Sequence, residues 1–156
     1  MTPIHCDRSL DRRRRQQRGA LGDDLDQGHA AALLAHRPEL MIKGIAEPAA
    51  LLHWLERATV LVLGPGLGQS PWGLGCFHTS LSQAKRSGKP IVMDADGLNL
   101  LSQGQDKQLK ASYDKWILTP HPGEAGRLLG KSTAAIQADR EAAARELQQR
   151  FGGAVI

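Results

Sequence analysis

Three short loops hold the side chains of this sequence that are best placed to bind a small molecule. They occupy residues 64–68, 94–99 and 119–124, and each follows a short apolar segment and precedes a stretch with helical character. In an open α/β sheet, ligands bind beyond the carboxyl ends of the strands. The sequence therefore predicts one small-molecule site, built from segments that are far apart in the chain.

The first loop, residues 64–68, has the sequence GPGLG. After a buried strand, small residues let backbone N–H groups approach a phosphate or a ring closely, and the following helix adds positive potential. The dinucleotide fingerprint G-x-G-x-x-G would need glycine at Gln69 or Pro71, so this loop does not match it. A tight strand-to-helix turn without a ligand explains the glycines equally well.

The second loop, residues 94–99, has the sequence DADGLN and carries two carboxylates two positions apart. Such a pair at a strand end can hold Mg²⁺ through water or accept a hydrogen bond from a ribose hydroxyl. Asp96 precedes a short expected helix and is predicted to cap it, because aspartate is a favoured N-cap residue. Asp94 lies nearer the strand tip and is the better functional candidate.

The third loop, residues 119–124, has the sequence TPHPGE and places His121 between two prolines. The prolines restrict the backbone and present the imidazole at the end of a strand, where it can hydrogen-bond or stack on a ligand. Glu124 falls in the first turn of the next helix, where a negative charge suits the helix dipole. A structural role is therefore favoured for Glu124.

The elements that position these loops alternate between strands and helices. Strands are expected at 59–63, 90–93, 116–119 and 154–156, and helices at 29–36, 48–57, 71–87, 98–101, 105–113, 124–129 and 133–151. The nearly continuous apolar run at 59–63 is typical of a strand buried on both faces of a parallel sheet. The alternation predicts an α/β fold, with helices on both faces of a parallel sheet.

Residues 1–28 differ from the rest, because they lack apolar periodicity and mix Arg, Asp, Gln and Gly. The arginine run at 12–15 is offset by nearby aspartates and is typical of a solvated tail. We therefore expect a disordered basic tail over 1–28 and a single α/β domain over 29–156.

The composition excludes several classes of protein. Hydrophobic residues make up 41% and charged residues 23%, which suits a globular protein. Although the net charge is +4, aromatic residues are only 4%, and no nucleic-acid partner is expected. No apolar run approaches the roughly 20 residues that span a bilayer. Cys6 and Cys76 are the only cysteines, which favours a cytoplasmic setting. The sequence has no group of His, Cys, Asp and Glu with the spacing of zinc ligands, so no metal site is predicted.

In order and spacing, the segments 61–68 (LVLGPGLG), 93–101 (MDADGLNLL) and 118–125 (LTPHPGEA) resemble the ADP/ATP-dependent NAD(P)H-hydrate dehydratases, and the resemblance extends over 29–156. It implies a partial ribokinase-like fold and the repair of nicotinamide cofactors that have been hydrated at the dihydropyridine ring. In the family, ADP or ATP, with Mg²⁺, phosphorylates the ring hydroxyl, and loss of phosphate restores NADH or NADPH. An NAD(P)H-hydrate epimerase domain is often fused in bacteria.

Carried over residue by residue, the resemblance implies that Gly66 and His121 contact the hydrated cofactor and that Asp94 and Asn99 line the same cleft. Family members continue into a Lys-Gly-x-Gly-Thr segment that holds the nucleotide and a Gly-x-Gly-Asp turn whose aspartate is the base. The given sequence stops at Ile156, before both segments. We therefore assign it no catalytic residue and expect an incomplete, inactive piece of the enzyme.

Other functions stay open on the sequence. A hydroxymethylpyrimidine or thiazole kinase would share the fold, but the sequences of the glycine loop (64–68) and the histidine loop (119–124) favour the dehydratase. A NAD-dependent dehydrogenase is disfavoured by the failed fingerprint. A catalytically silent binding module and a homo-oligomeric state are both left open.

Overall fold

The computed structural model describes residues 43–104 and 112–156. The chain divides into two units, Met1–Ala50 and Leu51–Ile156, and the three strand-end loops belong to the second. In the first unit, the described residues have no regular secondary structure before the 3-10 helix η2, Pro48–Ala50. The helix expected at 29–36 and the domain boundary expected after residue 28 lie outside the described residues.

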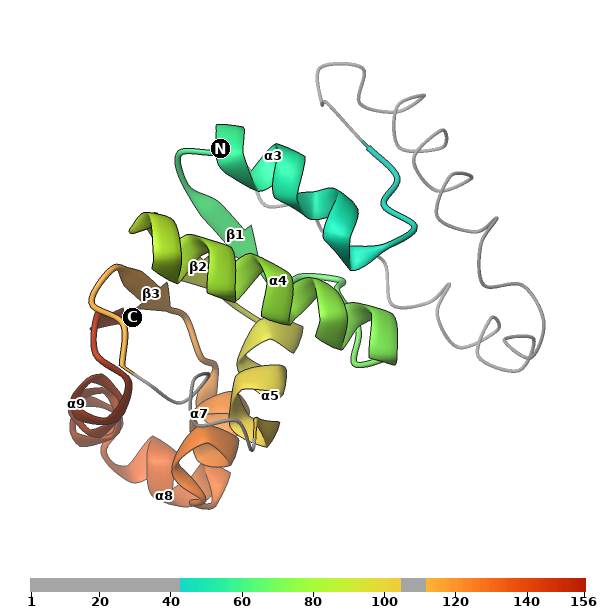
Figure 1. The fold of residues 1–156 in the computed structure, drawn as a ribbon. Helices are drawn as coiled ribbons and strands as arrows, with labels where there is room; N and C mark the ends of the chain where they lie inside the picture. Colours follow the sequence, from blue (N-terminus) through green and yellow to red (C-terminus); the bar gives the residue numbers. More distant parts are fainter. Residues whose placement is uncertain (1–42, 105–111) are drawn as a thin grey trace, which may run out of the picture. The chain divides into compact units, whose positions relative to one another are not determined.

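The second unit is a parallel sheet joined by helices (Figure 1). Its strands are β1 (Leu61–Leu63), β2 (Ile91–Met93), β3 (Trp116–Leu118) and β4 (Ala154–Val155). Its helices are α3 (Leu51–Arg57), α4 (Pro71–Ser87), α5 (Asp96–Gln103), α7 (Pro122–Leu129), α8 (Thr133–Ala138) and α9 (Arg140–Phe151). The described strands pair in parallel in the order β1-β2-β3-β4, which confirms the predicted α/β class.

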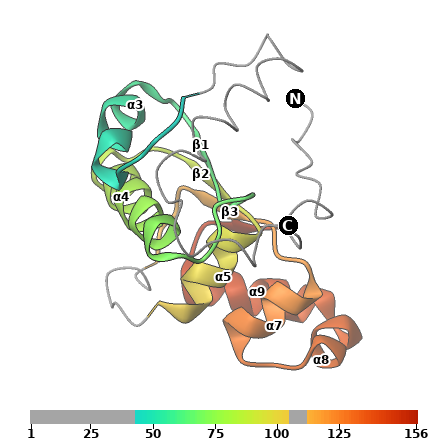
Figure 2. The same ribbon diagram turned by 90° about the vertical axis from the view of Figure 1, so that its right-hand side faces the viewer.

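The strand order determines where the helices lie. Crossovers between parallel strands are almost always right-handed, so successive crossovers in one direction place their helices on the same face. Met93 and Leu118 are fully buried on that face, whereas Val62 on the other face is 69% exposed. The prediction that 59–63 is buried on both faces is therefore wrong. Within residues 43–104 and 112–156, the buried residues of the helices form one cluster with the face of Met93 and Leu118, so the predicted helices on both faces are found on one face only. Figure 2 shows α3 and α4 packed side by side.

Local capping explains where the helices begin and end. Helix α4 starts at Pro71, because the Ser70 side chain accepts a first-turn N–H, and it ends at Gly88, which has a φ of 65°. The predicted bounds of 71–87 are confirmed. The single helix predicted at 133–151 is instead two helices, α8 and α9. The break falls at Asp139, whose carboxylate accepts the Ala142 N–H at 2.8 Å and caps α9.

The other bounds shift by a few residues. Helices α5 and α7 each begin two residues before their predicted starts at 98 and 124, and β1 begins two residues after residue 59. Of the helix predicted at 105–113, residues 105–111 lie outside the described residues, and Ser112 and Tyr113 are not helical. No helix in the described part of the chain is long and apolar enough to cross a bilayer.

The glycine turn after β1 lies directly against the start of α5. Gly64 has a φ of 129°, and a Cβ atom built on it would lie 1.9 Å from the Asp94 carbonyl oxygen. A Cβ atom on Gly97 would lie 2.6 Å from the Leu63 carbonyl oxygen. The two backbones therefore approach so closely that neither position has room for a side chain.

We expect Gly64→Ala to lower the free energy of unfolding by about 2–4 kcal/mol, because the methyl group would overlap a backbone oxygen and strain φ. Gly130→Ala is the matched control: φ is 69°, but the space beside it is open. Its cost should be about 1–2 kcal/mol, from the left-handed backbone alone. Urea denaturation measures both values, and equal losses would contradict the importance of the close approach.

Candidate functional site

The three loops follow the carboxyl ends of neighbouring strands. Leu63, Met93 and Leu118 are register partners in β1, β2 and β3, so the residues after them lie side by side at one edge of the sheet. Gly66 and His121 belong to two of these loops, and the third begins with Asp94. The predicted common edge is confirmed. Asn99, the remaining predicted site residue, lies in the first turn of α5.

Gly66 is the third residue of a tight turn. Leu67 N donates to Gly64 O at 3.0 Å, Pro65 occupies the second position, and Gly66 has a φ of 73°. These are the features of a type II turn, which needs positive φ at the third residue. A Cβ atom on Gly66 would meet nothing within 4 Å, so the space beside it is open. The turn needs a positive φ at this position, which glycine adopts without strain, and the open space leaves room for a ligand.

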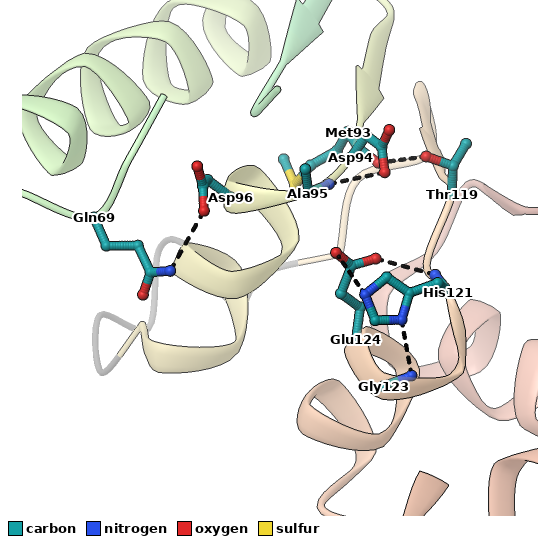
Figure 3. A network of polar contacts seen from close by, with 9 residues as sticks. All are labelled: Gln69, Met93, Asp94, Ala95, Asp96, Thr119, His121, Gly123 and Glu124. Atoms are coloured by element: carbon teal, nitrogen blue, oxygen red, sulfur yellow. Dashed lines mark hydrogen bonds and ion pairs between the residues drawn. The ribbon is translucent and has the colours of Figure 1, made fainter. Parts of the chain in front are cut away.

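Asp96 connects the first loop to the second. Its carboxylate accepts a hydrogen bond from Gly68 N at 2.9 Å. It also accepts one from Gln69 Nε2 at 3.4 Å (Figure 3). The prediction that Asp96 caps the following helix is wrong. It is the first residue of α5, and Ala95, with a φ of 47°, occupies the N-cap position. Asp94 Oδ1 accepts the Ala95 N–H at 2.8 Å, directly before the helix.

These two carboxylates already accept hydrogen bonds within the loops. Asp94 binds its own loop, and both oxygens of Asp96 already accept N–H donors. Among residues 43–104 and 112–156, no group of three or more His, Cys, Asp and Glu could hold a metal. The idea that the pair holds Mg²⁺ is not supported by this donor set, and we assign no step to Mg²⁺.

The third loop is bonded to β2 and to the start of α7. Thr119 N donates to Met93 O at 3.1 Å, and Thr119 Oγ1 donates to the same oxygen at 3.3 Å. His121 is the N-cap of α7, because its Nδ1 accepts the Gly123 N–H at 3.0 Å. Glu124 Oε2 accepts the His121 N–H at 3.0 Å, and Glu124 Oε1 lies 3.3 Å from His121 Nε2 (Figure 3).

The His121 side chain is 61% exposed, whereas that of Glu124 is 6% exposed. The favoured structural role of Glu124 is confirmed, since it holds the first turn of α7. The contact between its second oxygen and the imidazole was not predicted. The spacing of an N-cap residue and a glutamate three positions later is the signal of reciprocal capping, and it could have identified this pair.

Asn99 Oδ1 is buried and has no hydrogen-bond partner within the described residues. A buried acceptor without a donor costs about 1–3 kcal/mol, so this atom is suited to a donor from a ligand or a water molecule. Asn99 therefore stays a candidate.

A small hollow of about 180 Å³ lies beside the third loop. Its lining is mostly apolar and comes from α7, α8, α9, β4 and the adjoining residues; it consists of Pro120, Pro122, Ala125, Ile136, Arg140, Ala143, Ala144, Leu147, Val155 and Ile156. Gly66, Asp94, Asn99 and His121 are not among them.

Burial displaces the pKa of two groups at the opposite edge of the sheet. It lowers the pKa of Lys85, whose Nζ lies 5.1 Å from the centre of the Trp116 ring. It raises the pKa of Tyr113, whose hydroxyl donates to Lys89 O at 2.8 Å. Both groups lie near the amino ends of the strands, so neither belongs to the candidate site.

Comparison with known proteins identifies relatives along most of the chain. Residues 24–156 match the family model described as NAD(P)H-hydrate dehydratase. The bifunctional NAD(P)H-hydrate repair enzyme Nnr of Escherichia coli (strain K12) is 44% identical over 126 residues, which are 81% of this chain and 22% of the relative. The ADP-dependent (S)-NAD(P)H-hydrate dehydratase of Neisseria meningitidis serogroup B (strain ATCC BAA-335 / MC58) is 38% identical over 126 residues, 80% of this chain and 40% of the relative.

A solved structure supports the same relationship. The ribokinase-like superfamily protein of Enterococcus faecalis V583 matches with a TM-score of 0.68 and 27% sequence identity, covering 81% of this chain and 42% of that structure. The predicted ribokinase-like fold and family resemblance are thus confirmed. The chain spans less than half the length of each of these relatives.

We expect Asp96→Ala to loosen the glycine turn, because Gly68 N would lose its acceptor. Hydrogen exchange at the Gly68 amide should rise by about tenfold or more, since bonds to charged groups contribute about 1.5–3 kcal/mol. The Lys89 amide, which donates to Ala84 O at the far end of α4, is the internal reference and should not change. Unchanged exchange at Gly68 would show that Asp96 does not hold the turn.

Proposed function

The chain belongs to the NAD(P)H-hydrate dehydratase family, and we propose on that premise that its strand-end loops bind the hydrated nicotinamide ring of damaged NADH or NADPH. The reaction we propose for the whole protein is dehydration driven by ADP or ATP. The ring hydroxyl takes a phosphoryl group from ADP or ATP and loses its proton. The C–O bond then breaks to release phosphate, and the neighbouring ring carbon loses a proton, which restores the C=C bond of NADH or NADPH. The partners are thus a small-molecule substrate and a nucleotide.

One structural observation supports this proposal most. Hydrogen bonds hold the three loops at one edge of the sheet: Asp96 bonds the second loop to Gly68 of the first, and Thr119 bonds the third loop to Met93, the last residue of β2. A site that is held in place before the ligand arrives loses less conformational freedom on binding. At this edge, Gly66 has open space beside it and His121 is exposed.

We assign each candidate residue a role that its chemistry allows. Gly66 lets the ligand approach the backbone, and His121 places its imidazole against the nicotinamide ring. The Asp94 carboxylate and the Asn99 amide oxygen accept hydrogen bonds from the ring carboxamide or from ribose hydroxyls. We assign no residue of this chain to phosphoryl transfer.

The setting we propose is cytoplasmic, without a nucleic-acid or membrane partner. Fusion to an epimerase domain would agree with the bifunctional name of the Escherichia coli relative. The Neisseria relative is ADP-dependent by name, and we propose ADP or ATP as the nucleotide for this protein. A small-molecule kinase of the same fold is the alternative, and substrate tests distinguish the two.

A chimera tests the proposal. The matching segment of the Escherichia coli relative is replaced by that of this chain, and recovery of NADPH absorbance from hydrated NADPH is measured with ADP or ATP. We expect the chimera to regenerate NADPH, and His121→Ala to lower kcat/KM by about tenfold or more, as loss of a positioning contact does. A folded chimera that phosphorylates hydroxymethylpyrimidine or a thiazole alcohol, but does not regenerate NADPH, would favour the kinase.

In the same chimera, Gly66→Asn tests the open space beside the glycine turn. Asparagine tolerates the left-handed backbone, so this change fills the space with little strain. We expect KM for hydrated NADPH to rise by about tenfold, because a side chain would occupy the ligand's position. Gly130→Asn is the matched control, because Gly130 has a similar φ and open surroundings but lies at the C-terminal end of α7, away from the strand-end loops. It should leave KM unchanged. An unchanged KM in Gly66→Asn would exclude Gly66 from the site.

A further inference from the structure

The His121 ring is held by the protein on the edge that carries both nitrogens. Nδ1 accepts the Gly123 N–H at 3.0 Å, and Nε2 lies 3.3 Å from Glu124 Oε1. Between the nitrogens, Cε1 faces the first turn of α7, because a Cβ atom on Gly123 would lie only 2.8 Å from it. With 61% of the side chain exposed, the ring offers its faces, and not its nitrogens, to a ligand.

This arrangement selects one tautomer. Because Nδ1 accepts a hydrogen bond, it carries no proton, so the neutral imidazole carries its proton on Nε2. The Nε2 proton then points toward a carboxylate oxygen that can accept it. In the other tautomer, a proton on Nδ1 would oppose the Gly123 N–H, and Nε2 would oppose the carboxylate.

Capping of α7 explains only half of what Glu124 does. A cap needs one acceptor for the His121 N–H, and glutamine serves in that position as well as glutamate does. The second oxygen of this buried carboxylate, Oε1, contacts the imidazole Nε2 at 3.3 Å. Burial of a carboxylate is unfavourable unless both oxygens are bonded, so the exposed ring is part of what keeps Glu124 in place.

We propose that Glu124 is a positioning residue, which fixes the tautomer and orientation of His121 so that the imidazole meets the hydrated nicotinamide ring through its face. The stacking half of this inference rests on the proposed function. The tautomer half is independent of it, because it concerns the protein without a ligand.

Glu124→Gln separates the two roles of the side chain. The amide oxygen still accepts the His121 N–H, but the amide NH₂ now opposes the Nε2 proton. The cap is kept and the ring is released. The first readout is the nitrogen NMR shifts of His121 in the full, ligand-free chain, assigned by their loss in His121→Ala. We expect the Nε2–H tautomer in the unmodified chain and a mixture in Glu124→Gln, with His53 and His78 unchanged.

The second readout is the Kd for hydrated NADPH by calorimetry. Glu124→Gln should weaken binding by about tenfold, within the range of coupling between residues in contact, and should have no further effect in a His121→Ala background. Glu146→Gln is the matched control, because it neutralises a half-exposed glutamate on α9 that pairs with Lys131. It should leave both readouts unchanged.

Gly123→Ala provides a test that keeps both side chains. Its methyl group would lie 2.8 Å from Cε1, at the free end of the His121 side chain, so the ring must move while the helix stays intact. We expect about the same tenfold loss of affinity. This variant decides the question if Glu124→Gln does not fold.

The outcomes are distinguishable. If Glu124→Gln keeps both the tautomer and the Kd of the unmodified chain, Glu124 is only a helix cap and the proposal is wrong. A change in tautomer without loss of affinity would overturn the stacking half alone. If the unmodified chain does not bind hydrated NADPH, the proposed function fails for this chain, and the NMR shifts alone decide whether Glu124 positions His121.

Discussion

The candidate site depends on the in-register parallel pairing of β1, β2 and β3. Neighbouring strands in a sheet lie about 4.8 Å apart, so the residues that follow Leu63, Met93 and Leu118 must emerge as neighbours. Because each strand is only three residues long, the sheet brings the loops to one edge but does not fix their conformations. Hydrogen bonds help to do that: Asp96 bonds to the glycine turn of the first loop, and Thr119 of the third loop bonds to the end of β2.

The same residues serve the fold and the proposed binding function. Gly66 has the positive φ that its turn needs and also leaves open space beside the backbone. His121 caps α7 and also presents an exposed ring. For such residues the structural and functional interpretations are not rivals, since a loop that binds a ligand must first be held in place by its own bonds. Variants that keep the structural role are therefore needed to isolate the functional one.

The sequence predicts the fold well where the signal is local. The bounds of α4 follow from Ser70, Pro71 and Gly88, and the strands follow from short apolar runs. The errors fall where a polar side chain chooses between partners. Asp139 divides the long helix predicted at 133–151 by capping α9, and Asp96 bonds to a turn 28 residues earlier instead of to its own helix. An apolar run alone could not show whether one or both faces of the sheet are buried, because the direction of the crossovers determines which face the helices cover.

The central claim is that the three loops form one binding edge, and an NMR titration of the ¹⁵N-labelled chain with hydrated NADPH tests it most directly. The account predicts that the backbone amides of Gly66, Ala95 and His121 shift together, with a single Kd, while those of α9 do not. Shifts confined to one loop, or shifts of the three loops with different Kd values, would contradict the account.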